Sequence, residues 1–201
     1  MTIGKLFVFE GADEVGKTTL ASMLAEAFRA NGRACELIGF PGNEVGTLGR
    51  HIYELHHKPK RFQVMRIDPT SLQMLHVAAH IDLIEHCILP ALRSKRTVVL
   101  DRFWWSAWVY GTAGGAKPAS LKIMVQAEMI HWKRIRPDRV FLITSRTPFE
   151  PQADHSKWKR ISALYRKLAS QEESNYPVTQ VRNDSAPEAA FLDIRRHVDG
   201  L

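Results

Sequence analysis

One eight-residue segment near the start of the chain restricts the possible fold more than any other feature. It follows an apolar run at residues 5–10, precedes an amphipathic run at 17–30, and fits the pattern G-x-x-x-x-G-K-[ST]. A glycine-rich turn between a strand and a helix points successive backbone N–H groups at one anion, and the positive end of the helix dipole faces the same point. The segment therefore predicts a phosphate-binding loop in an α/β domain. Its residues are Gly11, Ala12, Asp13, Glu14, Val15, Gly16, Lys17 and Thr18.

The loop also predicts a ligand. We expect all eight residues and Thr19 to contact ATP, with Lys17 reaching the β- and γ-phosphates and the Thr18 hydroxyl coordinating Mg²⁺. A chain of 201 residues leaves no room for a separate motor domain. The NKxD-type segment of guanine-binding proteins is missing, because Asn183 and Asp184 are adjacent. A small ATP-dependent kinase is therefore favoured.

The rest of the chain alternates strand-like and helix-like runs, which is typical of a parallel sheet with helices on both faces. We expect one domain over residues 1–201, a P-loop kinase three-layer α/β sandwich whose five-stranded parallel sheet is flanked by helices, with a small lid at about 146–160. The expected strands are 5–10, 34–40, 97–100, 139–144 and 177–181, the helices 17–30, 48–57, 69–92, 119–132, 156–170 and 187–197, and the loops 58–68 and 111–118.

Composition argues against membrane and secreted classes. The longest apolar runs are about four residues, whereas a membrane-spanning helix needs roughly 20. Glu10 and Asp13 interrupt any apolar core of a signal peptide. Cys35 and Cys87 form no C-x-x-C pair, and we interpret them as reduced core thiols. We expect a cytoplasmic protein that contacts no membrane.

The net charge of +7 is concentrated in one stretch of the chain. Residues 133–167 hold ten Lys or Arg against three Asp or Glu, which accounts for the whole excess. Such a surplus is consistent with a phosphate site, a nucleic-acid surface or a solvated helix, and composition alone leaves all three open.

Six segments taken together resemble the thymidylate kinase family, over residues 5 to about 195. The phosphate loop and Asp101-Arg102-Phe103 are the specific parts of the match. The segments are 9–19, Phe40-Pro41-Gly42 with 46–49, 75–79, Asp101-Arg102-Phe103 with Ser106 and Tyr110-Gly111, Arg136-Pro137-Asp138 with 140–143, and Arg160-Ile161 with Tyr165 and Leu168-Ala169. The resemblance implies ATP- and Mg²⁺-dependent phosphoryl transfer to a nucleoside monophosphate, as from dTMP to dTDP, in nucleotide biosynthesis.

The resemblance also implies roles for individual residues. Asp101 would hold Mg²⁺ together with Thr18, Arg102 would grip the acceptor phosphate, and Arg160 would close over the transferring γ-phosphoryl group. The implied catalytic residues are Lys17, Asp101, Arg102 and Arg160, and the implied acceptor-binding residues are Asp13, Phe40, Arg50, Val77, His80, Arg102 and Tyr110.

Several alternatives stay open. In our alignment, the Phe and Arg that the family carries on its acceptor helix are replaced by Val77 and Ile81. The acceptor could therefore be a hydroxyl on a nucleoside or on a modified base in DNA, which leaves DNA open as a partner. A third alternative is an ATP-binding regulatory protein without turnover. Family members commonly pair through helices, so a homodimer is also open.

Two side-chain clusters have more than one interpretation. His76 and His80, four residues apart on a helix, fit a metal pair, an acceptor pocket shared with Asp82, or simple helix packing. The tryptophans at 104–108 fit core packing or a platform for a nucleobase.

Overall fold

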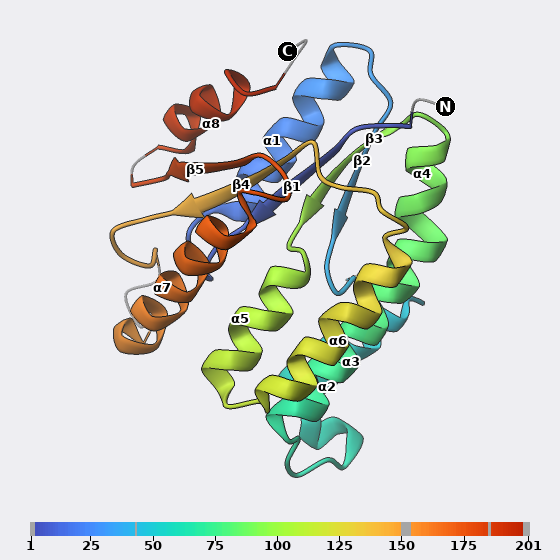
Figure 1. Cartoon of the computed structure of the whole chain (residues 1–201), viewed down its shortest axis with the longest axis vertical. Helices are drawn as coiled ribbons and strands as arrows, with labels where there is room; N and C mark the ends of the chain where they lie inside the picture. The colour runs from blue at the N-terminus through green and yellow to red at the C-terminus, as the bar shows by residue number, and fades with distance from the viewer. Residues whose placement is uncertain (1–2, 43, 150–153, 185, 199–201) are drawn as a thin grey trace.

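A computed structural model describes residues 3–42, 44–149, 154–184 and 186–198. Its centre is a fully parallel sheet of five strands in the order β2-β3-β1-β4-β5 (Figure 1). The strands are β1 (Leu6–Glu10), β2 (Cys35–Gly39), β3 (Thr97–Asp101), β4 (Arg139–Thr144) and β5 (Val178–Arg182). The predicted fold class and all five predicted strands are confirmed.

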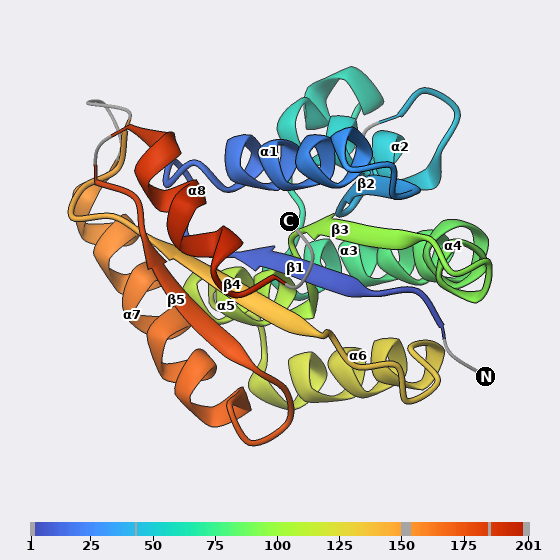
Figure 2. The same ribbon diagram turned by 90° about the horizontal axis from the view of Figure 1, so that it is seen from above.

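Helices cover both faces of the sheet (Figure 2). One face carries α1 (Lys17–Ala30) and α8 (Pro187–Arg195). The other carries α4 (Leu89–Arg93), α5 (Trp104–Gly114), α6 (Pro118–His131) and α7 (His155–Glu172). The remaining helices, α2 (Leu48–His57) and α3 (Pro69–Leu83), pack against each other, and a short 3₁₀ turn (Pro59–Phe62) lies between them.

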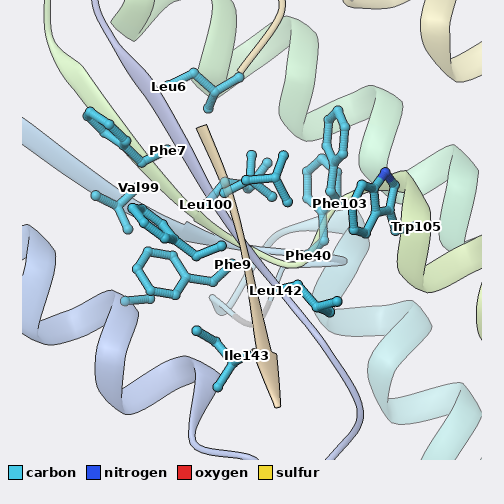
Figure 3. Packing of buried hydrophobic residues seen from close by; sticks show 14 of the residues in the cluster. Leu6, Phe7, Phe9, Phe40, Val99, Leu100, Phe103, Trp105, Leu142 and Ile143 are labelled. Atoms are coloured by element: carbon cyan, nitrogen blue, oxygen red, sulfur yellow. The ribbon is translucent and has the colours of Figure 1, made fainter. Parts of the chain in front are cut away.

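The core forms because the central strands are apolar on both sides. Residues 6–9 of β1 and 98–100 of β3 are almost completely buried, as expected for strands covered on both faces. Successive side chains point to opposite faces of the sheet. Phe7 and Phe9 point to the side of α1, where Phe7 stacks on Phe28, and Leu100 points to the side of Phe103 and Trp105 (Figure 3).

The helix predicted at 69–92 contains one irregular turn. Residues Ile84–Ile88 form a π-helical turn between α3 and α4, in which the Leu89 N–H donates to the Ile84 carbonyl five residues earlier. Pro90 accounts for the turn, since proline has no N–H and its ring collides with a regular helical backbone. Cys87 lies exposed on this turn, so the prediction that it is a core thiol was wrong, whereas Cys35 is buried.

The loop predicted at 111–118 is wrong in its first half, because α5 continues to Gly114. Gly111 has a packing reason in this helix: an added Cβ would lie 2.6 Å from Leu121 Cδ2 of α6, so a larger residue would force the Leu121 side chain to move. The helix ends at Gly115, whose φ of +84° is the left-handed conformation typical of a helix C-terminus.

One helix, Pro69–Arg93, is long and apolar enough by length and composition to cross a membrane. Half of the qualifying window is buried inside the protein, and α3 packs against α5 and α6. We therefore interpret it as a core helix. The lid predicted at 146–160 includes residues 150–153, which lie outside the described residues.

Candidate active site

The predicted phosphate loop joins the carboxyl end of β1 to the start of α1 (Figure 1). Gly11 and Gly16 have φ of +144° and +83°. A Cβ on Gly11 would lie 2.3 Å from the Ile143 carbonyl oxygen, and a Cβ on Gly16 would lie 2.4 Å from Asn183 Nδ2. Both positions therefore require glycine. The loop borders a hollow of about 280 Å³, lined by Asp13, Glu14, Gly16, Lys17, Thr18, Thr19, Arg102 and Phe149.

Lys17 is a buried cation at this hollow. Its Nζ donates a hydrogen bond to the Ala12 carbonyl at 2.5 Å, and the side chain is 5% exposed. Burial, with the nearby Arg102 charge, lowers the pKa of Lys17 to about 8, although Asp13, Asp101 and Glu10 partly offset this effect. A bound anion would supply the countercharge that these carboxylates supply only in part.

Thr18, in the first turn of α1, lies next to Asp101, the last residue of β3. The Thr18 hydroxyl donates to Asp101 Oδ2 at 2.6 Å. Asp101 Oδ1 is buried and has no hydrogen-bond partner within the described parts of the chain. A hydroxyl and a carboxylate with an unused oxygen are the donors that Mg²⁺ prefers, so these residues fit a magnesium site.

Arg102 faces the loop from the turn after β3. Its Nη2 donates to Asp13 Oδ1, and its guanidinium carbon lies 5.5 Å from the centroid of the Tyr110 ring. Burial opposes ionisation of Asp13, but the Arg102 and Lys17 charges together hold its pKa below the usual value. The structure thus brings together three residues expected to meet the acceptor: Asp13, Arg102 and Tyr110.

Phe40 and His80 also come together, further from the loop. Their rings stack with centroids 4.0 Å apart. His80 Nδ1 hydrogen-bonds Glu128 Oε2 at 2.9 Å, and Glu128 is fully buried. The His80 ring is therefore held by the Phe40 ring and by the Glu128 carboxylate, which also accepts a hydrogen bond from Trp132 Nε1 at 3.4 Å.

Val77 is not brought to the hollow. It is 4% exposed in a separate apolar cluster between α3, α5 and α6, and Ile81 packs against the same cluster. The preceding residue, His76, points in a different direction, with its Nε2 3.2 Å from His56 Nδ1. Burial, followed by the charges of His80, His56 and Arg102, lowers the pKa of His76 to about 3. His76 and His80, one position before Val77 and Ile81, therefore have contacts outside this apolar cluster.

This geometry also bears on the metal alternative. His76 and His80 have separate partners, His56 and Glu128, and the side chain of Asp82 pairs with His86 instead. No group of three His, Cys, Asp or Glu side chains among the described residues could hold a metal ion.

Neither Arg50 nor Arg160 is among the residues that line the hollow. Arg50, on α2, forms an ion pair with Glu54 at 3.0 Å. Arg160 is exposed on α7 and is not one of the residues that line the hollow. The start of α7 nevertheless contacts the loop, because Trp158 Nε1 donates to the Asp13 carbonyl at 2.8 Å.

The structure adds residues that sequence reasoning missed. Asn183 Nδ2 donates to the Val15 carbonyl at 2.9 Å, and the Phe149 N–H donates to the Glu14 carbonyl at 2.9 Å. The place of Asn183 directly after β5 was the only available signal, since ligands of parallel sheets gather at the carboxyl ends of strands. Trp104 and Trp105 are buried, which favours the packing interpretation of the tryptophan cluster.

Known proteins similar to this chain agree with the geometry. The family model described as thymidylate kinase matches residues 9–182. The thymidylate kinase of Dinoroseobacter shibae is 35% identical over 142 residues, which cover 70% of this chain and 64% of that protein. The thymidylate kinase of Acinetobacter baylyi is 29% identical over 206 residues, which cover 96% and 98%.

The first curated relatives are matched over only part of their length. The chain spans 64% of the Dinoroseobacter shibae protein and 56% of its Caldanaerobacter subterraneus counterpart. The crystal structure of thymidylate kinase from Ehrlichia chaffeensis has a TM-score of 0.77 at 20% identity, and the match covers 96% of this chain and 97% of that one. At this identity the likeness shows a shared fold.

Proposed function

The chain belongs to the thymidylate kinase family, and from this premise we propose that it transfers the γ-phosphoryl group of ATP to the phosphate of thymidine monophosphate. One observation carries the proposal. The phosphate loop and the Arg102 guanidinium line the same hollow, so that an anion on the loop and a second anion on Arg102 would be neighbours. Phosphoryl transfer depends mainly on such positioning and on positive charge.

The donor side of the hollow would hold ATP. The loop's backbone N–H groups and Lys17 would bind the β- and γ-phosphates, and the pKa of Lys17 would rise again once the phosphates supply a countercharge. Thr18 and Asp101 would hold Mg²⁺, whose chemistry is to neutralise charge on the phosphate oxygens. Arg160 remains a proposed contact of the γ-phosphoryl group if α7 moves toward the loop.

The acceptor side would hold thymidine monophosphate. Arg102 has a planar guanidinium that makes paired hydrogen bonds to phosphate oxygens. Asp13, beside it, would accept a hydrogen bond from a sugar hydroxyl, and Tyr110 would close the pocket against the sugar. The Phe40–His80 stack and His76 would face the base.

A different acceptor is the second candidate, because the sequence of α3 offers the imidazoles of His76 and His80 and not the Phe and Arg that the family carries on its acceptor helix. An imidazole and a guanidinium offer different hydrogen-bonding groups to a base edge. The transfer chemistry is the same in both candidates. We also propose a cytoplasmic location, in keeping with the family.

The test is ADP release with Mg·ATP over a panel of acceptors. The panel holds the deoxynucleoside and ribonucleoside monophosphates, the matching nucleosides, and single- and double-stranded DNA, with Lys17→Ala as the blank. Turnover fastest on thymidine monophosphate, with dTDP as product, supports the proposal. Turnover on another acceptor keeps the transfer and replaces the substrate. Nucleotide binding without turnover on any acceptor would reject a kinase in favour of a regulatory nucleotide-binding protein.

A further inference from the structure

Glu10 is a buried carboxylate for which the proposed chemistry has no use. It is the last residue of β1, directly before the phosphate loop, and is 0% exposed. Its Oε1 accepts hydrogen bonds from the N–H groups of Phe103 at 2.7 Å and Ser106 at 3.0 Å, and its Oε2 accepts one from Ser106 Oγ at 2.9 Å. These donors are 93 and 96 residues away in sequence, so Glu10 links the phosphate loop to the turn between β3 and α5.

That turn holds Arg102 in an unfavourable backbone conformation. Arg102 has φ of +75°, in the left-handed region that residues other than glycine occupy only when their surroundings fix them. On one side, its N–H donates to the Phe9 carbonyl at 2.9 Å. On the other, the bonds to Glu10 fix Phe103 and Ser106. The backbone before and after the strained Arg102 is therefore held by two parts of one segment: strand β1 accepts the Arg102 N–H, and the Glu10 carboxylate at the end of β1 binds the residues that follow.

The first turn of α5 also lacks a local cap. Helix N-termini leave backbone N–H groups without acceptors, and Phe103 at the N-cap position has no side-chain oxygen to offer. The Glu10 carboxylate replaces the missing cap from a different strand. Without it, the buried Phe103 N–H would have no acceptor, and the Ser106 N–H would keep only its bond to the Phe103 carbonyl at 3.0 Å. A buried N–H group without an acceptor is costly enough to displace the turn.

The same carboxylate reaches two further parts of the site through Ser106. Ser106 Oγ is 2.8 Å from the Tyr165 hydroxyl of α7 and accepts a longer hydrogen bond from Arg102 Nη1 at 3.4 Å. Burial raises the pKa of Glu10 to about 7, although Arg102, Ser106, Phe103 and Lys17 act in the opposite direction. A carboxyl group kept in such a place indicates that its hydrogen bonds have a specific use.

We propose that Glu10 is a positioning residue, whose carboxylate clamps the β3–α5 turn so that the Arg102 guanidinium is aimed at the acceptor phosphate. The inference rests on the proposed function only for the identity of the ligand that Arg102 meets.

Two variants separate the geometry of the clamp from its charge. Glu10→Gln keeps the hydrogen bonds, because its Oε1 can accept from both N–H groups while its amide donates to Ser106 Oγ. Glu10→Ala removes them. We expect Glu10→Ala to weaken calorimetric binding of thymidine monophosphate about 10-fold or more and that of a non-hydrolysable ATP analogue by less than about threefold. Glu10→Gln should restore acceptor binding to within about threefold of the native value.

A matched control removes a buried hydrogen bond from the same helix without touching the turn. Trp105 Nε1 donates to the Tyr176 hydroxyl at 2.8 Å, and Tyr176→Phe deletes that bond. This variant should lose stability and keep acceptor affinity. If Glu10→Ala does not fold, Ser106→Ala replaces it, since it removes the hydroxyl that donates to Glu10 Oε2. Equal loss of both ligands in Glu10→Ala, or Glu10→Gln as weak as Glu10→Ala, would overturn the clamp.

One readout needs no substrate. In protein labelled with ¹⁵N-arginine, the Arg102 side-chain signal, assigned with Arg102→Lys, should be sharp in the native protein and in Glu10→Gln and broad or shifted in Glu10→Ala. An Arg102 signal that does not respond to Glu10→Ala would refute the inference. If the native protein binds no thymidine monophosphate but the signal responds as expected, the proposed function fails and the clamp stands.

Discussion

The donor side and the acceptor side of the hollow are built from different parts of the chain. On the donor side, the backbone of one continuous loop supplies most of the groups that would bind phosphate. Gly11 and Gly16 lie where there is no room for a Cβ atom. On the acceptor side, the proposed contacts are side chains from the segment after β2, from α3 and from the turn after β3, and helix register decides which α3 side chains can take part. A phosphate site made by the backbone of one loop can therefore be recognised as a motif in the sequence. A site made by side chains from several helices and strands cannot be recognised in this way.

The largest effect is expected on the donor side. Replacing Lys17 by Met removes the buried cation that meets the β- and γ-phosphates, and kcat should fall about 1000-fold or more. Thermal unfolding is the control for folding. Because burial disfavours the charged form of Lys17, Tm should stay unchanged or rise. A kcat within about 10-fold of the native value would mean that the loop cradles phosphate without Lys17.

The acceptor side should respond separately at Arg102. In Arg102→Lys, a single ammonium replaces a fork of donors, so kcat/KM for the acceptor should fall about 100-fold while KM for ATP changes less than about threefold. Initial rates with each substrate varied in turn give both numbers. Equal losses for both substrates would erase the distinction between the two sides and make Arg102 a structural residue.

Substitutions of two consecutive residues on α3 test which face of this helix meets the acceptor. His76→Ala should raise KM for the acceptor about 10-fold, because His76 is proposed to face the base and is close enough to Arg102 for that charge to help lower its pKa. Val77→Ala should leave that KM unchanged and lower the free energy of unfolding by about 2 kcal/mol, since Val77 is buried between helices. Denaturant titration measures the stability of both variants, and initial rates measure their KM for the acceptor. A raised KM in Val77→Ala with an unchanged KM in His76→Ala would instead place Val77 at the acceptor.

The smallest expected effect is the uptake of protons when ATP binds on the donor side. With a pKa of about 8 in the free protein, Lys17 is half deprotonated at pH 8, and bound phosphate should raise that pKa. ATP binding at pH 8 should therefore take up about half a proton through Lys17, and almost none at pH 6, where Lys17 is already charged. Affinity then declines as pH rises above 8. Calorimetry in buffers of different ionisation enthalpy measures the uptake, and an equal uptake by Lys17→Met would assign it to another group.

Sequence alone was enough for the sheet, the loop and most helices, because these depend on local periodicity and on glycine spacing. It was not enough for α5, whose side chains include Trp104, Trp105, Ala107 and Val109, which are buried on several sides and give no amphipathic stripe. It also did not show that Val77 is buried between helices, since residues one apart on a helix point in different directions and only the packing partner selects the face. The role of Glu10 could not be predicted from the sequence either, because its hydrogen-bond partners lie more than 90 residues away.

The central claim is that one hollow holds both nucleotides, and a joined ligand tests it most directly. Adenosine and thymidine linked through five phosphates should bind, by calorimetry, at least about 100-fold more tightly than either ATP or thymidine monophosphate, because one association replaces two. Lys17→Met and Arg102→Lys should each weaken it. A joined ligand that binds no better than ATP and ignores Arg102→Lys would contradict the claim and place the acceptor somewhere other than beside the phosphate loop.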